Sequence, residues 1–258
     1  MDSFRTVIVI PCYQEAARLA PGLFADYLRD HTDTGFVFVD DGSTDGSAAL
    51  LDELAGRYPR SIAVLHNETN LGKGEAVRRG VLHALDRAEV LGYWDADLST
   101  PLQAIDELRQ ALLDNGAHLV MGARVKITGH RIVRKPWRHY PGRVFATLAS
   151  LVIGHAFYDT QCGAKLFTRD CAARCFARPF LSRWCFDIEL LLRLLRSYGI
   201  DSVDGANAGL IEYPLREWID DGDTRLTPWD VPRMAVDLGR IYVAYRLRGD
   251  PGGDITPA

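Results

Sequence analysis

Short apolar runs alternate with longer amphipathic stretches over the first half of the chain. Residues 5–10 (RTVIVI) form a continuous, largely β-branched run, which is typical of a strand buried on both faces. Further apolar runs occupy residues 36–39, 62–65, 90–94 and 118–121, and the helical patterns between them end near residues 29, 58, 87 and 113. Strands separated by helices of this length are typical of βαβ units, so an α/β fold with a mostly parallel sheet is expected.

The pattern changes after residue 121. Residues 115–158 contain no acid but seven lysines and arginines, and residues 144–153 are then almost entirely apolar. This segment is either a basic loop followed by a core helix, or an interfacial element that faces anionic lipid or a lipid phosphate. Strands are expected at 159–167 and 207–213 and helices at 169–176, 184–198 and 228–246, with a loop at 219–225. The Gly- and Pro-rich tail at 249–258 is expected to be disordered.

Composition narrows the class of protein. The chain has 258 residues, is 47% hydrophobic and 25% charged, and carries a net charge of −4, so no global field favours nucleic acid. Its five cysteines form no CxxC pair, which indicates a reducing compartment, and Cys171 and Cys175 are expected to be a buried pair. Without a signal peptide or an apolar run of 18 residues, a cytoplasmic protein is expected.

Polar side chains follow each predicted strand of the first half. Because the carboxyl ends of parallel strands meet at one edge of a sheet, we expect these side chains to line one crevice. They are Tyr13 and Glu15, Asp40 and Asp41, Asn67, Asp95 and Asp97, and Arg124.

Asp95 and Asp97 are the candidate metal ligands. They are two residues apart at the end of a predicted strand, and two carboxylates that converge on one point suit Mg²⁺ or Mn²⁺ bound to a diphosphate. A solvated aspartate pair in a turn is the alternative. Residues 72–74 (GKG) could hold a phosphate at a helix N-terminus, but they form neither a Walker A loop nor a dinucleotide fingerprint.

Four segments in this order resemble family 2 glycosyltransferases with a GT-A fold: residues 11–15 (PCYQE), 39–45 (VDDGSTD), 70–74 (NLGKG) and 95–98 (DADL). Residues 159–167 (DTQCGAKLF) and 183–190 (RWCFDIEL) look like the dolichyl-phosphate glucosyltransferase branch, close to dolichyl-phosphate mannosyltransferases. The resemblance implies a twisted, mostly parallel sheet with helices on both faces. It also implies one domain at 1–248, with a Rossmann-like nucleotide-sugar half (1–122) and an acceptor half (123–248).

The resemblance also implies roles for individual residues. Asp97 would be the main ligand of Mg²⁺ or Mn²⁺, with Asp95 against the ribose or the metal. The residues that would bind the donor are Pro11, Tyr13, Glu15, Asp40, Lys73, Asp95 and Asp97. The catalytic candidates are Arg124, Lys165 and Asp187. The residues on the acceptor or phosphate side are Arg124, Arg131, Arg134, Glu217, Trp218 and Arg225.

The reaction that the resemblance implies is a single inverting displacement. A hexose, with UDP-glucose favoured over GDP-mannose as donor, would pass to a polyprenyl or dolichyl phosphate. An acceptor phosphate is already ionised and needs no base, whereas a hydroxyl acceptor would need one, for which Asp187 is the candidate; Asp187 could equally cap its helix. The basic, acid-free segment favours the phosphate and a peripheral position on the cytoplasmic face of the membrane.

The sequence departs from the family pattern in two ways. Ser99 replaces the glutamine that mannosyltransferases of this group usually carry, and the membrane helices of many relatives are absent. A soluble glycosyltransferase with a hydroxyl acceptor and a GDP-mannose-dependent enzyme therefore stay open as alternatives. A sugar nucleotidyltransferase would need a glycine-rich, lysine-bearing signature after the first strand, which is missing, and a binding module without activity is the last alternative.

Overall fold

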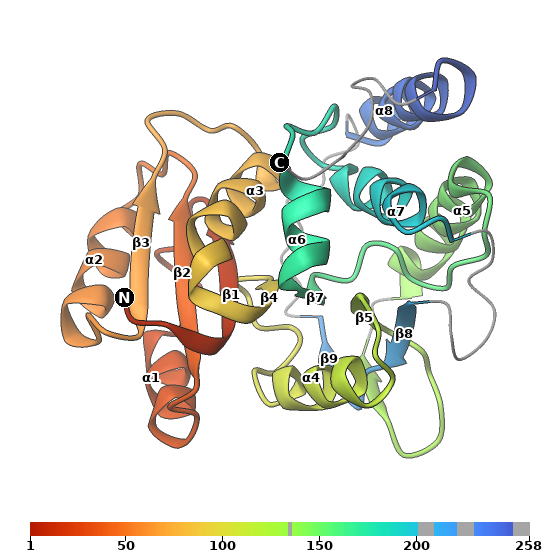
Figure 1. Ribbon diagram of the computed structural model, residues 1–258. Helices are drawn as coiled ribbons and strands as arrows, with labels where there is room; N and C mark the ends of the chain where they lie inside the picture. Colours follow the sequence, from red (N-terminus) through yellow and green to blue (C-terminus); the bar gives the residue numbers. More distant parts are fainter. Residues whose placement is uncertain (134–135, 201–208, 221–229, 250–258) are drawn as a thin grey trace.

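A computed structural model describes residues 1–133, 136–200, 209–220 and 230–249. In these residues seven strands form the main sheet, in the order β3-β2-β1-β4-β7-β5-β8 (Figure 1). The strands are β1 (Phe4–Cys12), β2 (Thr34–Asp40), β3 (Ile62–His66), β4 (Ala88–Trp94), β5 (Leu119–Ala123), β7 (Ala164–Thr168) and β8 (Leu210–Pro214). Only β7 runs antiparallel to its neighbours among the paired strands described, so the prediction of a mostly parallel sheet is confirmed.

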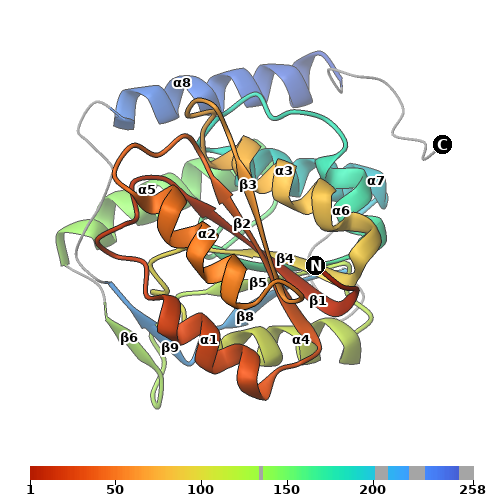
Figure 2. The same cartoon turned by 90° about the vertical axis from the view of Figure 1, so that its left-hand side faces the viewer.

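Helices cover both faces of this sheet, as expected (Figures 1 and 2). One face packs against α1 (Pro21–Asp30), α2 (Ser47–Arg57) and α4 (Ala104–Asp114). The other packs against α3 (Lys73–Ala84), α5 (Pro136–Ile153), α6 (Arg169–Phe176) and α7 (Phe186–Ser197). The last helix, α8 (Asp230–Tyr242), continues as a π-helical turn to Leu247 and lies over the second layer. No helix in the described part of the chain is long and apolar enough to cross a bilayer.

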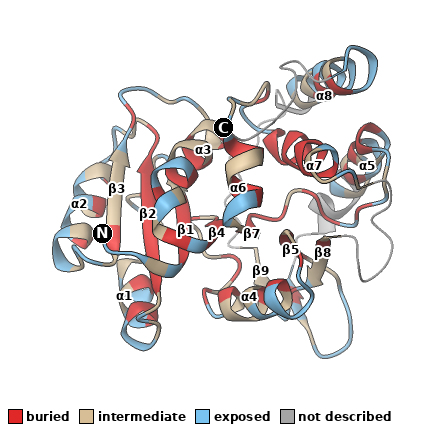
Figure 3. Ribbon diagram, in the orientation of Figure 1, coloured by how far each residue is buried: buried red, intermediate tan, exposed pale blue. Residues whose placement is uncertain are grey.

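The central strands explain the unbroken apolar run at the start of the chain. Successive side chains of a strand point to opposite faces. Val7 and Val9 therefore join the core beneath α3 and α7, whereas Ile8 and Ile10 join the core beneath α1 and α4. All four side chains are fully buried, and β1 and β2 are coloured as buried along most of their length in Figure 3.

The sequence prediction was wrong at three places in the second half. The predicted strand at 159–167 begins only at Ala164, because residues 159–163 form a loop that packs against Asp95. The helix expected from residue 144 begins at Pro136, so much of the basic segment is helical. Two short strands, β6 (Arg131–Val133) and β9 (Glu217–Ile219), were not predicted; they pair in parallel as a separate ribbon.

Some predictions lie outside the described residues. These are Arg134, Arg225, the tail at 250–258, most of the loop at 219–225 and the first residues of the strand predicted at 207–213. All five cysteines are free and buried, and Cys171 and Cys175 have their sulfurs 3.9 Å apart, as expected of a buried thiol pair.

Candidate active site

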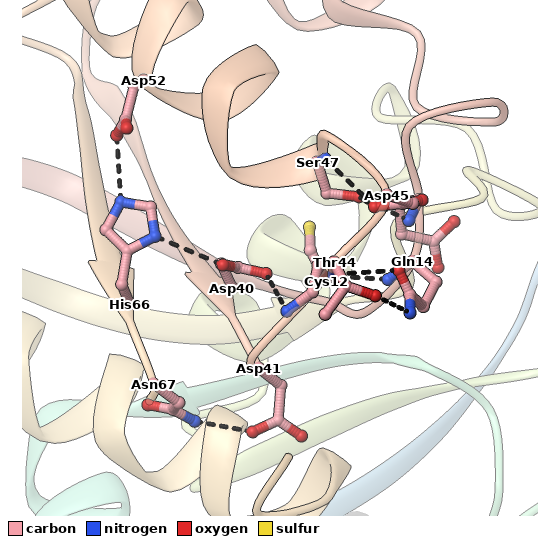
Figure 4. Close-up of polar contacts among 12 residues, drawn as sticks. Cys12, Gln14, Asp40, Asp41, Thr44, Asp45, Ser47, Asp52, His66 and Asn67 are labelled. Atoms are coloured by element: carbon pink, nitrogen blue, oxygen red, sulfur yellow. Dashed lines mark hydrogen bonds and ion pairs between the residues drawn. The ribbon is translucent and has the colours of Figure 1, made fainter. Parts of the chain in front are cut away.

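The loop after β1 is held by the loop after β2. The side-chain amide of Gln14 donates to the Thr44 hydroxyl (3.0 Å) and accepts from the Thr44 N–H (3.1 Å), and the Glu15 N–H donates to the Ser47 hydroxyl (2.7 Å; Figure 4). Gln14 has φ +54°, a left-handed conformation that non-glycine residues rarely adopt. These contacts hold a strained residue beside Tyr13 and Glu15, as is common at functional sites.

Asp40 and Asp41 have different partners although they are adjacent. Asp41 accepts from the Asn67 amide (2.6 Å) and from the N–H groups of Leu71 (2.9 Å) and Gly72 (2.8 Å). It therefore fixes the loop that leads into α3. Asp40 accepts from the Ser43 N–H (3.1 Å) and lies 3.3 Å from a ring nitrogen of His66. The structural role of Asp41 was not predicted.

Lys73 and Asp95 form an ion pair at the end of β4. Their Nζ and Oδ1 atoms are 2.5 Å apart, although the two residues come from the loops after different strands. Burial disfavours both charges, but the pairing outweighs it: the pKa of Lys73 is raised and the pKa of Asp95 is lowered. Two predicted donor residues are thus in contact, and both remain charged.

Asp97 lies in the turn that follows. Its Oδ1 accepts from the Ser99 N–H (2.9 Å), and its Oδ2 lies 3.7 Å from the guanidinium of Arg18. Arg18 also lies 3.2 Å from Glu15, so it connects this turn to the loop after β1. Arg18 was missed in the sequence, although it lies only three residues after the 11–15 motif. Leu98 has φ +51°, a second strained position at the same edge of the sheet.

The side chains at this edge fit a divalent cation that is shared with a ligand. In the described residues no group of three or more His, Cys, Asp or Glu side chains could hold a metal by itself. Mg²⁺ and Mn²⁺ commonly bind one or two carboxylates, with water and substrate phosphates completing the shell. Lys73 lies 2.5 Å from Asp95, whereas Arg18 lies only within 3.7 Å of Asp97, so we expect Asp97 to be the better protein ligand of the two.

Arg124, at the end of β5, is held by Asp159. The guanidinium makes a bidentate ion pair with this carboxylate, through Nε (2.5 Å) and an amino nitrogen (2.6 Å), and its carbon lies 5.1 Å from the centre of the Trp218 ring. Asp159 is fixed in turn by Glu212, which accepts its backbone N–H (2.8 Å). Burial opposes the charge of Arg124, but Asp159 raises its pKa further above its usual range. Asp159 and Glu212 were not predicted.

The ribbon of β6 and β9 brings together the predicted acceptor residues that the structure describes. It places Arg131 3.1 Å from Glu217 and carries Trp218 beside Arg124. The N–H of Ile219 then donates to the carbonyl of Ser99 (3.0 Å), two residues after Asp97. The ribbon therefore joins the predicted acceptor side to the turn that bears the candidate metal ligand.

Lys165 and Asp187 form a buried ion pair. Lys165 is fully buried, and its Nζ donates to Asp187 (2.7 Å) and to the carbonyls of Thr160 (3.0 Å) and Cys162 (2.7 Å). Because an ammonium has three donors, these contacts use all of them. Asp187, 4% exposed, also accepts from the Tyr93 hydroxyl. The Asp187 carboxylate makes no capping hydrogen bond in α7, so the alternative that it caps this helix was wrong. Because Lys165 also donates to two carbonyls of the 159–163 loop, the ion pair fixes this loop from the core side.

Gly163 is the position where this loop meets Asp95. The Asp95 N–H donates to its carbonyl (3.0 Å), and a Cβ added here would overlap the Asp95 carboxylate. We expect Gly163→Ala to displace Asp95 from Lys73 and to lower the free energy of unfolding by about 1–3 kcal/mol in urea titrations. Gly22→Ala, where a Cβ meets nothing within 4 Å, is the control and should not destabilise. Equal stability of the two variants would contradict this packing.

The chain was compared with known families and proteins. The model of the family Glycosyl transferase family 2 matches residues 7–176. A dolichyl-phosphate beta-glucosyltransferase of Trichomonas vaginalis is 32% identical over 93% of this chain and 72% of its own length. The human dolichyl-phosphate beta-glucosyltransferase is 31% identical over 92% and 75%. A polyprenol monophosphomannose synthase of Mycolicibacterium smegmatis is 28% identical over 83% and 86%.

Solved structures share the fold. Glucosyl-3-phosphoglycerate synthase from Mycobacterium tuberculosis, in complex with UDP, has a TM-score of 0.62 at 18% identity, covering 93% of this chain and 79% of the other. The same enzyme in complex with Mn²⁺, UDP and glucosyl-3-phosphoglycerate has a TM-score of 0.60 at 18% identity, covering 97% and 82%. The order of strands and the layers of helices are thus those of a known architecture.

Proposed function

Because the chain belongs to glycosyl transferase family 2, we propose that it transfers glucose from UDP-glucose to a polyprenyl phosphate such as dolichyl phosphate, with inversion at C1. The observation that carries the proposal is the link between two groups of side chains. The Ile219–Ser99 hydrogen bond ties the ribbon bearing Trp218 to the turn that holds Asp97. This link supports the proposal, because it brings Trp218, which lies beside Arg124, next to the turn that bears Asp97.

The donor side has the chemistry to hold a nucleotide sugar. In this proposal Tyr13, Glu15 and Asp40 contact the base and ribose, and Lys73 faces the diphosphate. Asp97, with Asp95, holds Mg²⁺ or Mn²⁺, which would neutralise charge on the leaving diphosphate when bound. The crystallised structural relative with Mn²⁺ and UDP supports this arrangement, and so does the ionised state of the Lys73–Asp95 pair.

The acceptor side favours a phosphate over a hydroxyl. Arg124 stays charged and its guanidinium has five N–H donors, two of which donate to the Asp159 carboxylate. A bidentate contact between arginine and phosphate is a strong charge-assisted interaction. Asp187, the candidate base for a hydroxyl acceptor, is buried against Lys165 and Tyr93. A phosphate oxygen is ionised at neutral pH and can attack C1 without such a base.

We also propose that the two halves of the chain bind different substrates. Residues 1–122 hold the donor, and residues 123–248 hold the acceptor. On α5, Val144, Leu148 and Leu151 are exposed at positions i, i+4 and i+7, within the acid-free segment 115–158. An exposed apolar stripe of this kind supports peripheral contact with the membrane that contains a lipid acceptor.

Thermal shift tests the donor half of the proposal. UDP or UDP-glucose with Mn²⁺ should raise the melting temperature more than GDP or GDP-mannose, because a ligand that binds only the native state stabilises it, by about 2.7 kcal/mol at a hundred times Kd. The same nucleotides with a chelator are the control and should give a smaller shift. A larger shift with the guanine nucleotides would overturn the choice of donor.

A further inference from the structure

His66, at the end of β3, lies between two carboxylates. Its Nδ1 is 3.3 Å from Asp40 and its Nε2 is 3.0 Å from Asp52 on α2 (Figure 4). The His66 ring thus connects the exposed carboxylate of Asp52 on α2 to the buried carboxylate of Asp40 at the end of β2. Nothing in the sequence pattern singled it out, because His66 precedes rather than belongs to the 70–74 motif.

The two partners determine the protonation state of the ring. An ionised carboxylate only accepts hydrogen bonds, so both ring nitrogens must donate, and only the imidazolium form does so. Burial lowers the pKa of His66, but Asp52 and Asp40 outweigh it and the pKa is raised. These two carboxylates, one on α2 and one at the end of β2, are the charged groups in contact with the ring that contribute most to the raised pKa.

The contact restricts how Asp40 is oriented. Asp40 is 3% exposed, its Oδ1 accepts from the Ser43 N–H (3.1 Å), and its Oδ2 faces His66. A carboxylate held through both oxygens cannot rotate, and it presents its remaining lone pairs in a fixed direction. His66 therefore restricts the orientation of a predicted donor-binding residue, although His66 is not itself one of the predicted donor-binding residues.

We propose that His66 is a positioning residue of the donor site: as an imidazolium it holds Asp40 in the orientation that accepts an N–H of the uracil base. The inference rests on the proposed function and deepens it. Because the imidazolium is present at low pH and lost as the pH rises through the raised pKa of His66, the affinity for UDP-glucose should fall over that interval. The rate of chemistry at saturating donor should change little, since the ring touches none of the reacting atoms.

The test is the pH profile of KM for UDP-glucose in the wild type and three variants. His66→Gln should raise this KM about tenfold or more at low pH, as expected for loss of one charge-assisted hydrogen bond, and should abolish its pH dependence. Asp52→Asn removes an anion from an exposed position and should move the midpoint of the profile to lower pH. His83→Gln, on α3 outside the site, is the matched control and should leave the profile unchanged.

Each outcome has a clear consequence. If His66 only joins β3 to α2, His66→Gln should lower the melting temperature without altering the pH profile of KM. That result would overturn the inference. The inference would also be refuted if the wild type uses UDP-glucose and both His66→Gln and Asp52→Asn show the wild-type pH profile of KM. The proposed function would then still stand. A wild type that does not use UDP-glucose would refute the proposed function, and the inference would fall with it.

Discussion

Replacement of Asp97 with alanine is expected to lower glucose transfer by about a thousandfold or more while the fold survives. In the proposed mechanism Asp97 is the main ligand of the metal, because Asp95 is engaged by Lys73. Without its ligand the cation would no longer neutralise the leaving diphosphate. The side chain is partly exposed, accepts from the Ser99 N–H and lies 3.7 Å from the Arg18 guanidinium, so the cost in stability should be about 1–2 kcal/mol.

Two further variants make the Asp97 experiment specific. Asp97→Asn keeps an oxygen for the Ser99 N–H but is a weaker metal ligand, so added Mn²⁺ should restore part of its activity. Asp114→Ala, at the exposed end of α4, is the matched control and should transfer at the wild-type rate. Retention of most activity by a folded Asp97→Ala enzyme would show that the metal is held elsewhere.

Replacement of Lys165 with methionine is expected to destabilise the fold by about 3–5 kcal/mol, because it leaves the Asp187 carboxylate buried without its cation. The double variant Lys165→Met with Asp187→Leu removes both charges and should be more stable than the single one. Urea unfolding of the single and double variants measures the difference. A single variant as stable as the wild type would mean that the pair is not buried as described.

The same pair separates the two kinds of acceptor. If Asp187 were the base for a hydroxyl acceptor, a folded Asp187→Asn enzyme would lose about a hundredfold or more in rate. If the acceptor is a phosphate, Asp187→Asn should lose activity only because less of the protein is folded and the 159–163 loop is displaced. The pH dependence of its rate should then match that of the wild type. Loss of the low-pH limb from the pH profile of the folded variant would favour the hydroxyl acceptor, because a general base must be deprotonated to act.

The first half of the fold was predictable because its signals are local. The run at residues 5–10 is buried on both faces, and the polar residues that end each strand meet where parallel strands end. Lys73 was not among these strand-end residues, and its contact with Asp95 was not predicted. The ribbon of β6 and β9 was not predictable, because each strand has three residues and its partner lies far away in the chain.

The partners of the predicted residues were harder to anticipate than the residues themselves. Arg124 was selected as an acceptor residue, but the carboxylate that orients it, Asp159, lies 35 positions further on in a segment expected to be a strand. Lys165 and Asp187 were expected to act on the substrate, and their burial against each other depends on how α7 packs on β7. Such contacts are set by tertiary packing and leave no periodic trace in the sequence.

Transfer of radiolabelled glucose from UDP-glucose into a lipid phase tests the central claim most directly. The purified chain would be incubated with the labelled donor, Mn²⁺ and a polyprenyl phosphate, with polyprenol and 3-phosphoglycerate as alternative acceptors in parallel. The account predicts metal-dependent label in the organic phase with polyprenyl phosphate, as a β-linked glucosyl phosphate, and none with the other two. Label that reaches polyprenol or 3-phosphoglycerate but not polyprenyl phosphate would contradict it.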